Sequence, residues 1–311
     1  MIKKILRKIR KLGYKKTFKI VLSKIKGPFV PLIHSLRWSL FLKAKKSGIT
    51  ECEYQKPLII SLTTYPARIH TVHLVIESLL MQNLKPNKII LWLANEQFPM
   101  GEEDLPQSLL KLKDFGLTIE WCEDIRSYKK LIPTLRQYPD SLIITADDDL
   151  FYNRNMVKKL YNAYLKEPDL IHCHRVTKFE RNNGQWDVIA GGYDVYSKPT
   201  FLHKLTGGSG ALYPINSLFG DITNADLFMT LAPSNDDIWF WLMAVLNAKK
   251  CNVLENGHPE LYFTKGSQAT ALCNVNDNGE KLFWKQLNNI FEYYPQIEKI
   301  LIDEWERVSN S

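Results

Sequence analysis

Short apolar runs that alternate with segments of helical periodicity dominate the sequence after residue 56. The strand-like runs cover residues 57–63, 88–94, 117–122, 142–146 and 169–176. Between them, apolar residues recur every three or four positions, which predicts helices over residues 69–83, 128–138 and 153–167. Apolar strands that alternate with helices are typical of a mostly parallel sheet covered by helices on both faces. The pattern therefore predicts an α/β fold.

The pattern loosens after residue 176 but keeps recognisable elements. The segments NNG (182–184) and GG (191–192) indicate a hairpin or loop region, and TGGSGALYP (206–214) a glycine-rich loop. A helix is expected over 235–250 and a long amphipathic stretch over 279–308. Because no linker rich in Gly, Ser or Pro interrupts the chain, we expect one globular domain over residues 51–311.

The first 50 residues differ sharply in charge from the rest of the chain. They hold 15 Lys or Arg and no Asp or Glu, whereas the remaining residues hold 26 basic and 33 acidic side chains. A basic arm on a net acidic body is not the charge distribution of a nucleic-acid-binding fold, whose folded surface is usually basic. It suits a peripheral anchor on anionic lipid better, and we expect no nucleic-acid partner.

Within this arm, apolar positions keep helical spacing among the basic ones. The spacing predicts a basic amphipathic helix with the apolar residues Ile2, Ile5, Leu6, Ile9 and Leu12. Residues 29–42 are more apolar, but they are shorter than a membrane span and contain Pro31, His34 and Arg37. We therefore expect residues 1–46 to lie on an anionic membrane surface; the alternative is a helix that packs on its own domain.

Cysteine usage and short motifs exclude several classes of site. The five cysteines are scattered without a CxxC pair, which indicates a reducing compartment and argues against a disulfide framework. The chain also lacks GxGxxG and HExxH motifs.

Three consecutive aspartates, Asp147, Asp148 and Asp149, directly follow the apolar run 142–146. Ligands of parallel sheets bind at the carboxyl ends of the strands, and these carboxylates lie at such an end. The D-x-D pair of Asp147 and Asp149 could hold Mn²⁺ or Mg²⁺, which take one or two carboxylates and complete their coordination with substrate phosphates and water. The alternative is a solvated acidic turn.

Four segments resemble one family, the bacterial GT-A glycosyltransferases that build surface polysaccharides such as lipopolysaccharide. The resemblance runs through residues 56–275 and rests on SLTTYPARI (61–69), SYKKLIPTLRQYPDSLIITADDDLFY (127–152), GGSGALYP (207–214) and NDDIWFW (235–241). It implies a GT-A, Rossmann-like fold with a DXD motif, preceded by the basic helical arm, which is not part of the resemblance.

The resemblance also implies roles for individual residues. The nucleotide-sugar site would include Thr63, Thr64, Tyr65, Arg68, Lys130, Asp147, Asp148 and Gly208. The metal ligands would be Asp147, Asp149 and a late histidine, His258. Asp237 or Asp236 would take the proton from the acceptor hydroxyl, and we favour Asp237. Both acids begin a predicted helix, so the alternative is that they only cap it.

We therefore expect a metal-dependent hexosyltransferase. Its donor would be a nucleotide-diphosphate sugar, UDP-linked by preference, and its acceptor a sugar hydroxyl of a lipid-linked, lipopolysaccharide or capsule glycan. It would act in the cytoplasm, peripherally on the inner face of the cell membrane. The alternatives are a metal-dependent nucleotidyltransferase or phosphotransferase and a non-catalytic scaffold that binds sugar nucleotides. Inversion or retention of the anomeric configuration stays open.

Overall fold

The computed structural model describes residues 26–192, 198–255, 257, 261–270 and 282–310. The chain divides into two compact units between Lys46 and Ser47, and each is described by itself. The amphipathic helix predicted at residues 2–12 lies outside the described residues.

The described part of the first unit is helical. A short 3₁₀ turn, η1 (Gly27–Phe29), leads into helix α3 (Val30–Lys43), and Pro31 occupies the first turn of α3, where its missing N–H costs nothing. Large apolar side chains are exposed along this segment, namely Phe29, Leu32, Ile33, Leu36, Leu40 and Leu42. In the part of the chain that the structure describes, no helix combines the length and apolar character needed to cross a membrane.

The second unit is built on a seven-stranded sheet with the order β10-β5-β9-β4-β1-β2-β3. Its strands are β1 (Leu58–Thr63), β2 (Lys88–Ala94), β3 (Leu117–Cys122), β4 (Leu142–Ala146), β5 (Ile171–Cys173), β9 (Ala211–Tyr213) and β10 (Cys251–Val253). All neighbours are parallel except β9, which runs antiparallel to β4 and β5. The mostly parallel sheet predicted from the sequence is confirmed.

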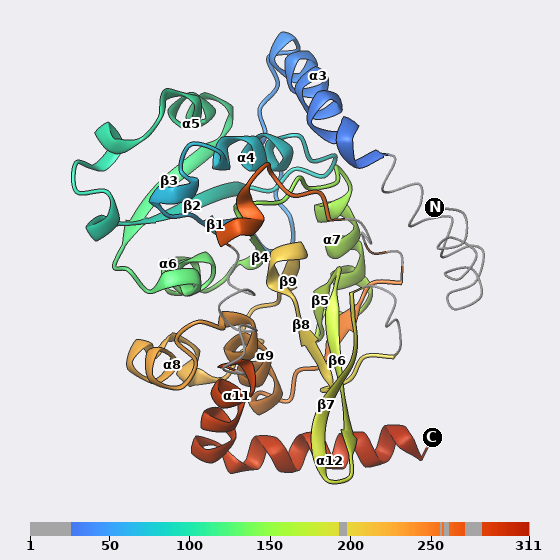
Figure 1. The fold of residues 1–311 in the computed structure, drawn as a ribbon. Helices are drawn as coiled ribbons and strands as arrows, with labels where there is room; N and C mark the ends of the chain where they lie inside the picture. Colours follow the sequence, from blue (N-terminus) through green and yellow to red (C-terminus); the bar gives the residue numbers. More distant parts are fainter. Residues whose placement is uncertain (1–25, 193–197, 256, 258–260, 271–281, 311) are drawn as a thin grey trace, which may run out of the picture. The chain divides into compact units, whose positions relative to one another are not determined.

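Helices cover both faces of this sheet (Figure 1). The helices of this unit are α4 (Val72–Leu80), α5 (Gln107–Leu110), α6 (Ile132–Gln137), α7 (Met156–Lys166), α8 (Ala225–Leu231), α9 (Asp236–Leu246), α11 (Leu282–Tyr293) and α12 (Pro295–Ser309). Short 3₁₀ turns connect them at η2 (Pro66–Arg68), η3 (Asn95–Gln97), η4 (Gly101–Asp104), η5 (Lys111–Phe115), η6 (Arg126–Lys130), η7 (Gly207–Ser209), η8 (Gly220–Thr223) and η9 (Ser267–Thr270).

Alternation along the strands decides which helix packs on which face. Ser61 and Trp92 point to the same side, where their side chains both bond the Thr134 hydroxyl of α6 at 2.7 Å. Figure 1 shows α4 on the opposite side of β1 and β2. On the α6 side, an aromatic core joins η6 to α8 and α9, and within it Tyr128 stacks on Phe228 with ring centroids 4.0 Å apart.

A second, three-stranded sheet has the order β7-β6-β8. Its strands are β6 (Val176–Asn182), β7 (Gln185–Gly192) and β8 (His203–Leu205). The hairpin predicted in this region is confirmed: β6 and β7 pair, and Asn183 and Gly184 both have positive φ, 50° and 80°, as a two-residue hairpin loop requires.

One prediction of element boundaries was wrong, and two others gain detail. The single strand expected over 169–176 is divided, because β5 belongs to the large sheet and β6 begins the small one at Val176. Gly191 and Gly192 lie at the end of β7, the second strand of the hairpin that β7 forms with β6. The amphipathic stretch 279–308 forms two helices in its described part, since Pro295 cannot continue α11 and instead occupies the first turn of α12.

The strand order places a topological switch point between β1 and β4. From β1 the chain continues on one side to β2, whereas β4 adds on the other side, with Leu62 opposite Ala146. The carboxyl ends of β1 and β4 are therefore neighbours, and ligands of open α/β sheets bind at such a point. The loop after β1 and the three aspartates after β4 meet there.

Candidate active site

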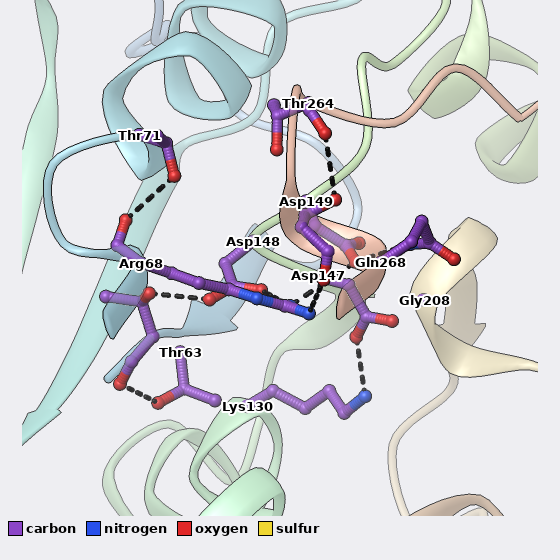
Figure 2. A network of polar contacts seen from close by, with 12 residues as sticks. Thr63, Arg68, Thr71, Lys130, Asp147, Asp148, Asp149, Gly208, Thr264 and Gln268 are labelled. Carbon is purple, nitrogen blue, oxygen red and sulfur yellow. Dashed lines mark hydrogen bonds and ion pairs between the residues drawn. The ribbon is translucent and has the colours of Figure 1, made fainter. Parts of the chain in front are cut away.

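Asp148 is the most firmly held of the three aspartates (Figure 2). The Thr64 hydroxyl donates to its Oδ2 at 2.6 Å, and Arg68 Nη1 donates to its Oδ1 at 2.5 Å. Burial raises the pKa of Asp148, while Arg68 and Thr64 act in the opposite direction by stabilising the carboxylate. Both carboxylate oxygens are thus bound by the loop that follows β1.

Asp149 lies between Arg68 and a later segment, residues 262–268. Its Oδ2 is 3.3 Å from Arg68 Nη1 and accepts a hydrogen bond from Gln268 Nε2 at 3.2 Å. The Asp149 carbonyl oxygen accepts from the Thr264 amide at 2.8 Å. Burial and the Asp147 carboxylate raise the pKa of Asp149 to about 7, although Arg68 opposes the shift. The ionised form of Asp149 is therefore poorly stabilised in the metal-free protein.

Lys130 joins the aspartates to helix α9. Its ammonium is 2.7 Å from Asp147 Oδ1 and 3.0 Å from Asp236 Oδ2, and the side chain is buried. Burial alone would lower the pKa of Lys130, but Asp147, Asp236 and Asp237 raise it well above its ordinary value. Lys130 is therefore a permanent cation in this cluster. The Asp147 side chain stays 38% exposed, which leaves it open to a ligand.

The glycine-rich loop contacts two carboxylates through consecutive residues. The Gly207 amide donates to Asp237 Oδ1 at 3.0 Å. A Cβ at Gly208 would overlap the Asp147 carboxylate, so only glycine lets that carboxylate lie against the loop here. Tyr152 fastens the same loop, because its hydroxyl donates to the Gly208 carbonyl and accepts from the Asp147 amide.

Asp236 and Asp237 differ in their surroundings although they are adjacent. Asp236 is buried, accepts from the Ser127 hydroxyl at 2.9 Å and faces Lys130. Asp237 is only partly buried; burial raises its pKa, Lys204 opposes the shift, and Asp236 adds to it. The capping side chain of α9 is Asn235, which accepts from the Ile238 amide at 3.3 Å. The N-terminus of α9 is therefore capped by Asn235, so neither aspartate is needed for capping.

The remaining predicted site residues are placed as follows. Thr63 is half-buried and donates to the Trp92 carbonyl oxygen at 2.9 Å, on the neighbouring strand β2. Tyr65 is also half-buried, and its ring centroid lies 5.7 Å from the Arg68 guanidinium carbon. His258, the predicted third metal ligand, lies outside the described residues.

The charges of the cluster bear on whether it suits a divalent cation. Five carboxylates interact with three cationic side chains here, namely Asp147, Asp148, Asp149, Asp236 and Asp237 with Arg68, Lys130 and Lys204. The excess of two negative charges and the oxygen donors fit Mn²⁺ or Mg²⁺. No group of three or more His, Cys, Asp or Glu with the geometry of a metal site occurs among the described residues. Two carboxylates with substrate phosphates satisfy such ions, so Asp147 and Asp149 remain the predicted ligands.

Sequence reasoning missed several residues of this site. Tyr152, Ser127 and Gln268 were not singled out, although each bonds a predicted site residue or its backbone. Tyr152 had a local signal, since it stands three positions after the aspartates. Gln268 had none, because 119 positions separate it from Asp149.

Comparisons with known proteins give matches among solved structures only. No family model and no curated protein matches the sequence. S. aureus TarS, in its complex with UDP-GlcNAc, is 14% identical in sequence and has a TM-score of 0.46. The match covers 69% of this chain and 61% of the TarS chain. A mannosyltransferase from Pyrobaculum calidifontis, in complex with GDP-Man and Mn²⁺, is 13% identical with a TM-score of 0.42. That match covers 76% of this chain and 65% of the mannosyltransferase. An inositol-1-phosphate CTP transferase from T. maritima is 9% identical with a TM-score of 0.40, and the match covers 72% of this chain and 97% of the transferase. The chain thus spans under two thirds of TarS and of the mannosyltransferase.

Proposed function

We propose that the protein is a metal-dependent glycosyltransferase that moves a hexose from a nucleotide-diphosphate sugar, UDP-linked by preference, to a sugar hydroxyl. The observation that supports this most directly is the carboxylate cluster at the switch point, with its excess negative charge and its separate acid, Asp237. The resemblance in the four sequence segments supports it independently. The proposed acceptor is a lipid-linked glycan of lipopolysaccharide or capsule biosynthesis.

In the proposed mechanism, Asp147 and Asp149 would hold Mn²⁺ or Mg²⁺, and the bound ion would supply positive charge that stabilises the diphosphate as a leaving group. The loop after β1 receives the nucleotide, with Thr63 near the ribose and Tyr65 against the base. Lys130 keeps Asp147 in place and adds positive charge beside the diphosphate. Gly208 lets the loop backbone approach the Asp147 carboxylate closely, because it has no side chain.

Asp237 is the proposed general base. Its raised pKa makes the carboxylate a stronger proton acceptor than an ordinary surface aspartate, and the Gly207 amide fixes its orientation at 3.0 Å. Asp236 is a weaker candidate, since Lys130 and Ser127 already engage its two oxygens. The base role requires an inverting reaction; in a retaining enzyme only the metal and donor roles would remain.

The products separate this proposal from its rivals. With a sugar nucleotide, Mn²⁺ and a membrane extract as acceptor source, we expect release of a nucleoside diphosphate and a sugar-extended acceptor. Release of pyrophosphate, or transfer of a nucleotidyl or phosphoryl group, would instead identify a nucleotidyltransferase or phosphotransferase. Binding of the donor without any turnover across nucleotide sugars and membrane fractions would favour the scaffold.

We also propose that the basic arm holds the enzyme on the inner face of the cell membrane, beside a lipid-linked acceptor. Lys26, Arg37, Lys43 and further basic residues accompany the exposed apolar side chains of α3, and residues 1–50 carry no acid. Such a combination suits the headgroup region of an anionic bilayer. The boundary between the arm, residues 1–50, and the catalytic domain, residues 51–311, belongs to the same proposal.

Vesicle binding tests the arm. In the full chain, Leu36→Ser with Leu40→Ser removes two side chains that are 59% and 66% exposed, and should weaken binding to anionic vesicles about tenfold or more. Met100→Ser removes a side chain that is 63% exposed on the other unit and should change nothing. Equal binding by all three proteins in a flotation assay would contradict the anchor, as would equal binding to neutral vesicles.

A further inference from the structure

One segment of the active-site region has no role in the proposed mechanism: residues 262–268, which follow β10 at a distance in the sequence. It is attached to the aspartates at several points. The Phe151 amide donates to the Tyr262 carbonyl at 2.8 Å, and the Thr264 amide donates to the Asp149 carbonyl at 2.8 Å. Gln268 Nε2 adds the bond to Asp149 Oδ2. The segment thus lies along the chain that carries the aspartates.

Arg68 is the side chain that joins this segment to the loop after β1. Its Nη1 contacts Asp148 and Asp149, and its Nη2 donates to the Ser267 carbonyl at 2.8 Å. The Arg68 side chain is 12% exposed, and its bonds to Asp148 and Ser267 span 80 and 199 positions of the sequence. Figure 2 shows this side chain running across the two carboxylates toward the segment that carries Gln268.

We infer that Arg68 is a positioning residue that clasps the 262–268 segment onto Asp148 and Asp149, so that this segment forms one wall of the donor site. The inference rests on the proposed function in calling this region a donor site. The contacts by which Arg68 holds the segment do not depend on that function. It differs from the direct nucleotide-sugar contact that the resemblance implies for Arg68, because both terminal nitrogens of Arg68 already bind the protein.

The planar guanidinium suits this role better than an ammonium would. It presents several N–H donors in a fixed plane, so that it can bond two carboxylates on one side and a carbonyl oxygen on the other. A lysine at the same position could retain one ion pair but could not hold all three groups. Arg68→Lys therefore keeps the positive charge but removes the simultaneous contacts with Asp148, Asp149 and Ser267.

Hydrogen exchange in the substrate-free full chain tests the clasp. In Arg68→Lys we expect the Thr264 amide to exchange about tenfold faster than in the wild type, or more, because the segment loses its attachment through Ser267. Arg68→Gln should behave similarly, and Arg154→Lys, on the loop before α7, should leave the exchange unchanged. Thermal melting distinguishes the expected local release from loss of the whole fold, in which strand β1 would exchange faster too.

Two results would overturn the inference. In Arg68→Lys, unchanged protection of Thr264 together with a raised KM for the donor would make Arg68 a phosphate contact and not a clasp. Faster exchange throughout β1 and β4 in Arg68→Lys would make it a general structural residue. Hydrogen exchange needs no turnover, so it tests the role of Arg68 even in a protein without transferase activity. Absence of that activity would therefore count against the proposed function and not against the clasp. If the activity is present, the clasp also predicts that kcat falls in Arg68→Lys, since the wall is loosened with the donor bound.

Discussion

Asp149→Asn should lower metal-stimulated hydrolysis of the sugar nucleotide by ~10²–10³-fold, the range expected when a group that stabilises transition-state charge is lost. Asparagine keeps an oxygen for the bonds from Gln268 and Arg68, so the local structure should persist while the negative charge is removed. Turnover measured with and without Mn²⁺ checks this. Asp140→Asn, at an exposed position before β4, is the matched control. Unchanged turnover of Asp149→Asn would refute the assignment of this ligand.

The pKa of Asp149 gives the same variant a second readout. Burial raises the pKa to about 7, so the metal-free folded protein holds this proton more tightly than the unfolded chain does. The resulting stabilisation is present below about pH 4 and is lost as the pH rises through about 7. Manganese affinity should follow the opposite course and strengthen through the same interval, because the carboxylate must be ionised. Asp149→Asn should remove the Asp149 contribution from both pH dependences, as followed by thermal melting and manganese titration.

Asp237→Asn should reduce transfer to the acceptor on the order of 10²–10⁴-fold while donor affinity stays unchanged. The amide oxygen can still accept the bond from Gly207, so the glycine-rich loop should keep its place. In the wild type, transfer should fall as the pH drops through the raised pKa of Asp237, since only the carboxylate accepts a proton. The residual rate of Asp237→Asn should lack that acidic limb. Calorimetric donor binding and a pH profile of kcat check both expectations.

The neighbouring acid supplies the control for this experiment. Asp236→Asn removes the charge that faces Lys130 at 3.0 Å, so it should affect stability and the placement of Asp147 more than the pH profile. If Asp236→Asn abolished the acidic limb and Asp237→Asn did not, the two roles would have to be exchanged. A loss of donor binding in Asp237→Asn equal to its loss of transfer would identify a structural residue.

The sheet was predictable from the sequence because its information is local. Residues 88–94, 117–122 and 142–146 are apolar runs whose burial favours strands of a covered sheet, and they form β2, β3 and β4 with those bounds. The position of the aspartates at the carboxyl end of β4 follows from the same pattern. The division between β5 and β6 was not predictable, since residues 169–176 read as one run and only the second sheet separates them.

The ion pairs of the aspartates were not predictable from local sequence, although the resemblance placed Arg68, Lys130 and the aspartates in one site. The sequence hypothesis paired the aspartates with a metal ion, whereas the structure pairs Asp148 with Arg68 and Asp147 with Lys130. Arg68 stands 80 positions from Asp148, and nothing in its local sequence indicates an ion pair. Such pairings depend on which strands become neighbours, and a single sequence contains no direct record of that.

The adjacency of Gly207 and Gly208 has a consequence for how this protein could be re-engineered. One peptide unit stands between the carboxylate assigned to the donor, Asp147, and the one assigned to the acceptor, Asp237. An insertion in this loop, or a bulkier residue at position 208, would shift both at once. Attempts to broaden the choice of acceptor should therefore leave these two glycines intact and vary surfaces farther from the peptide they share.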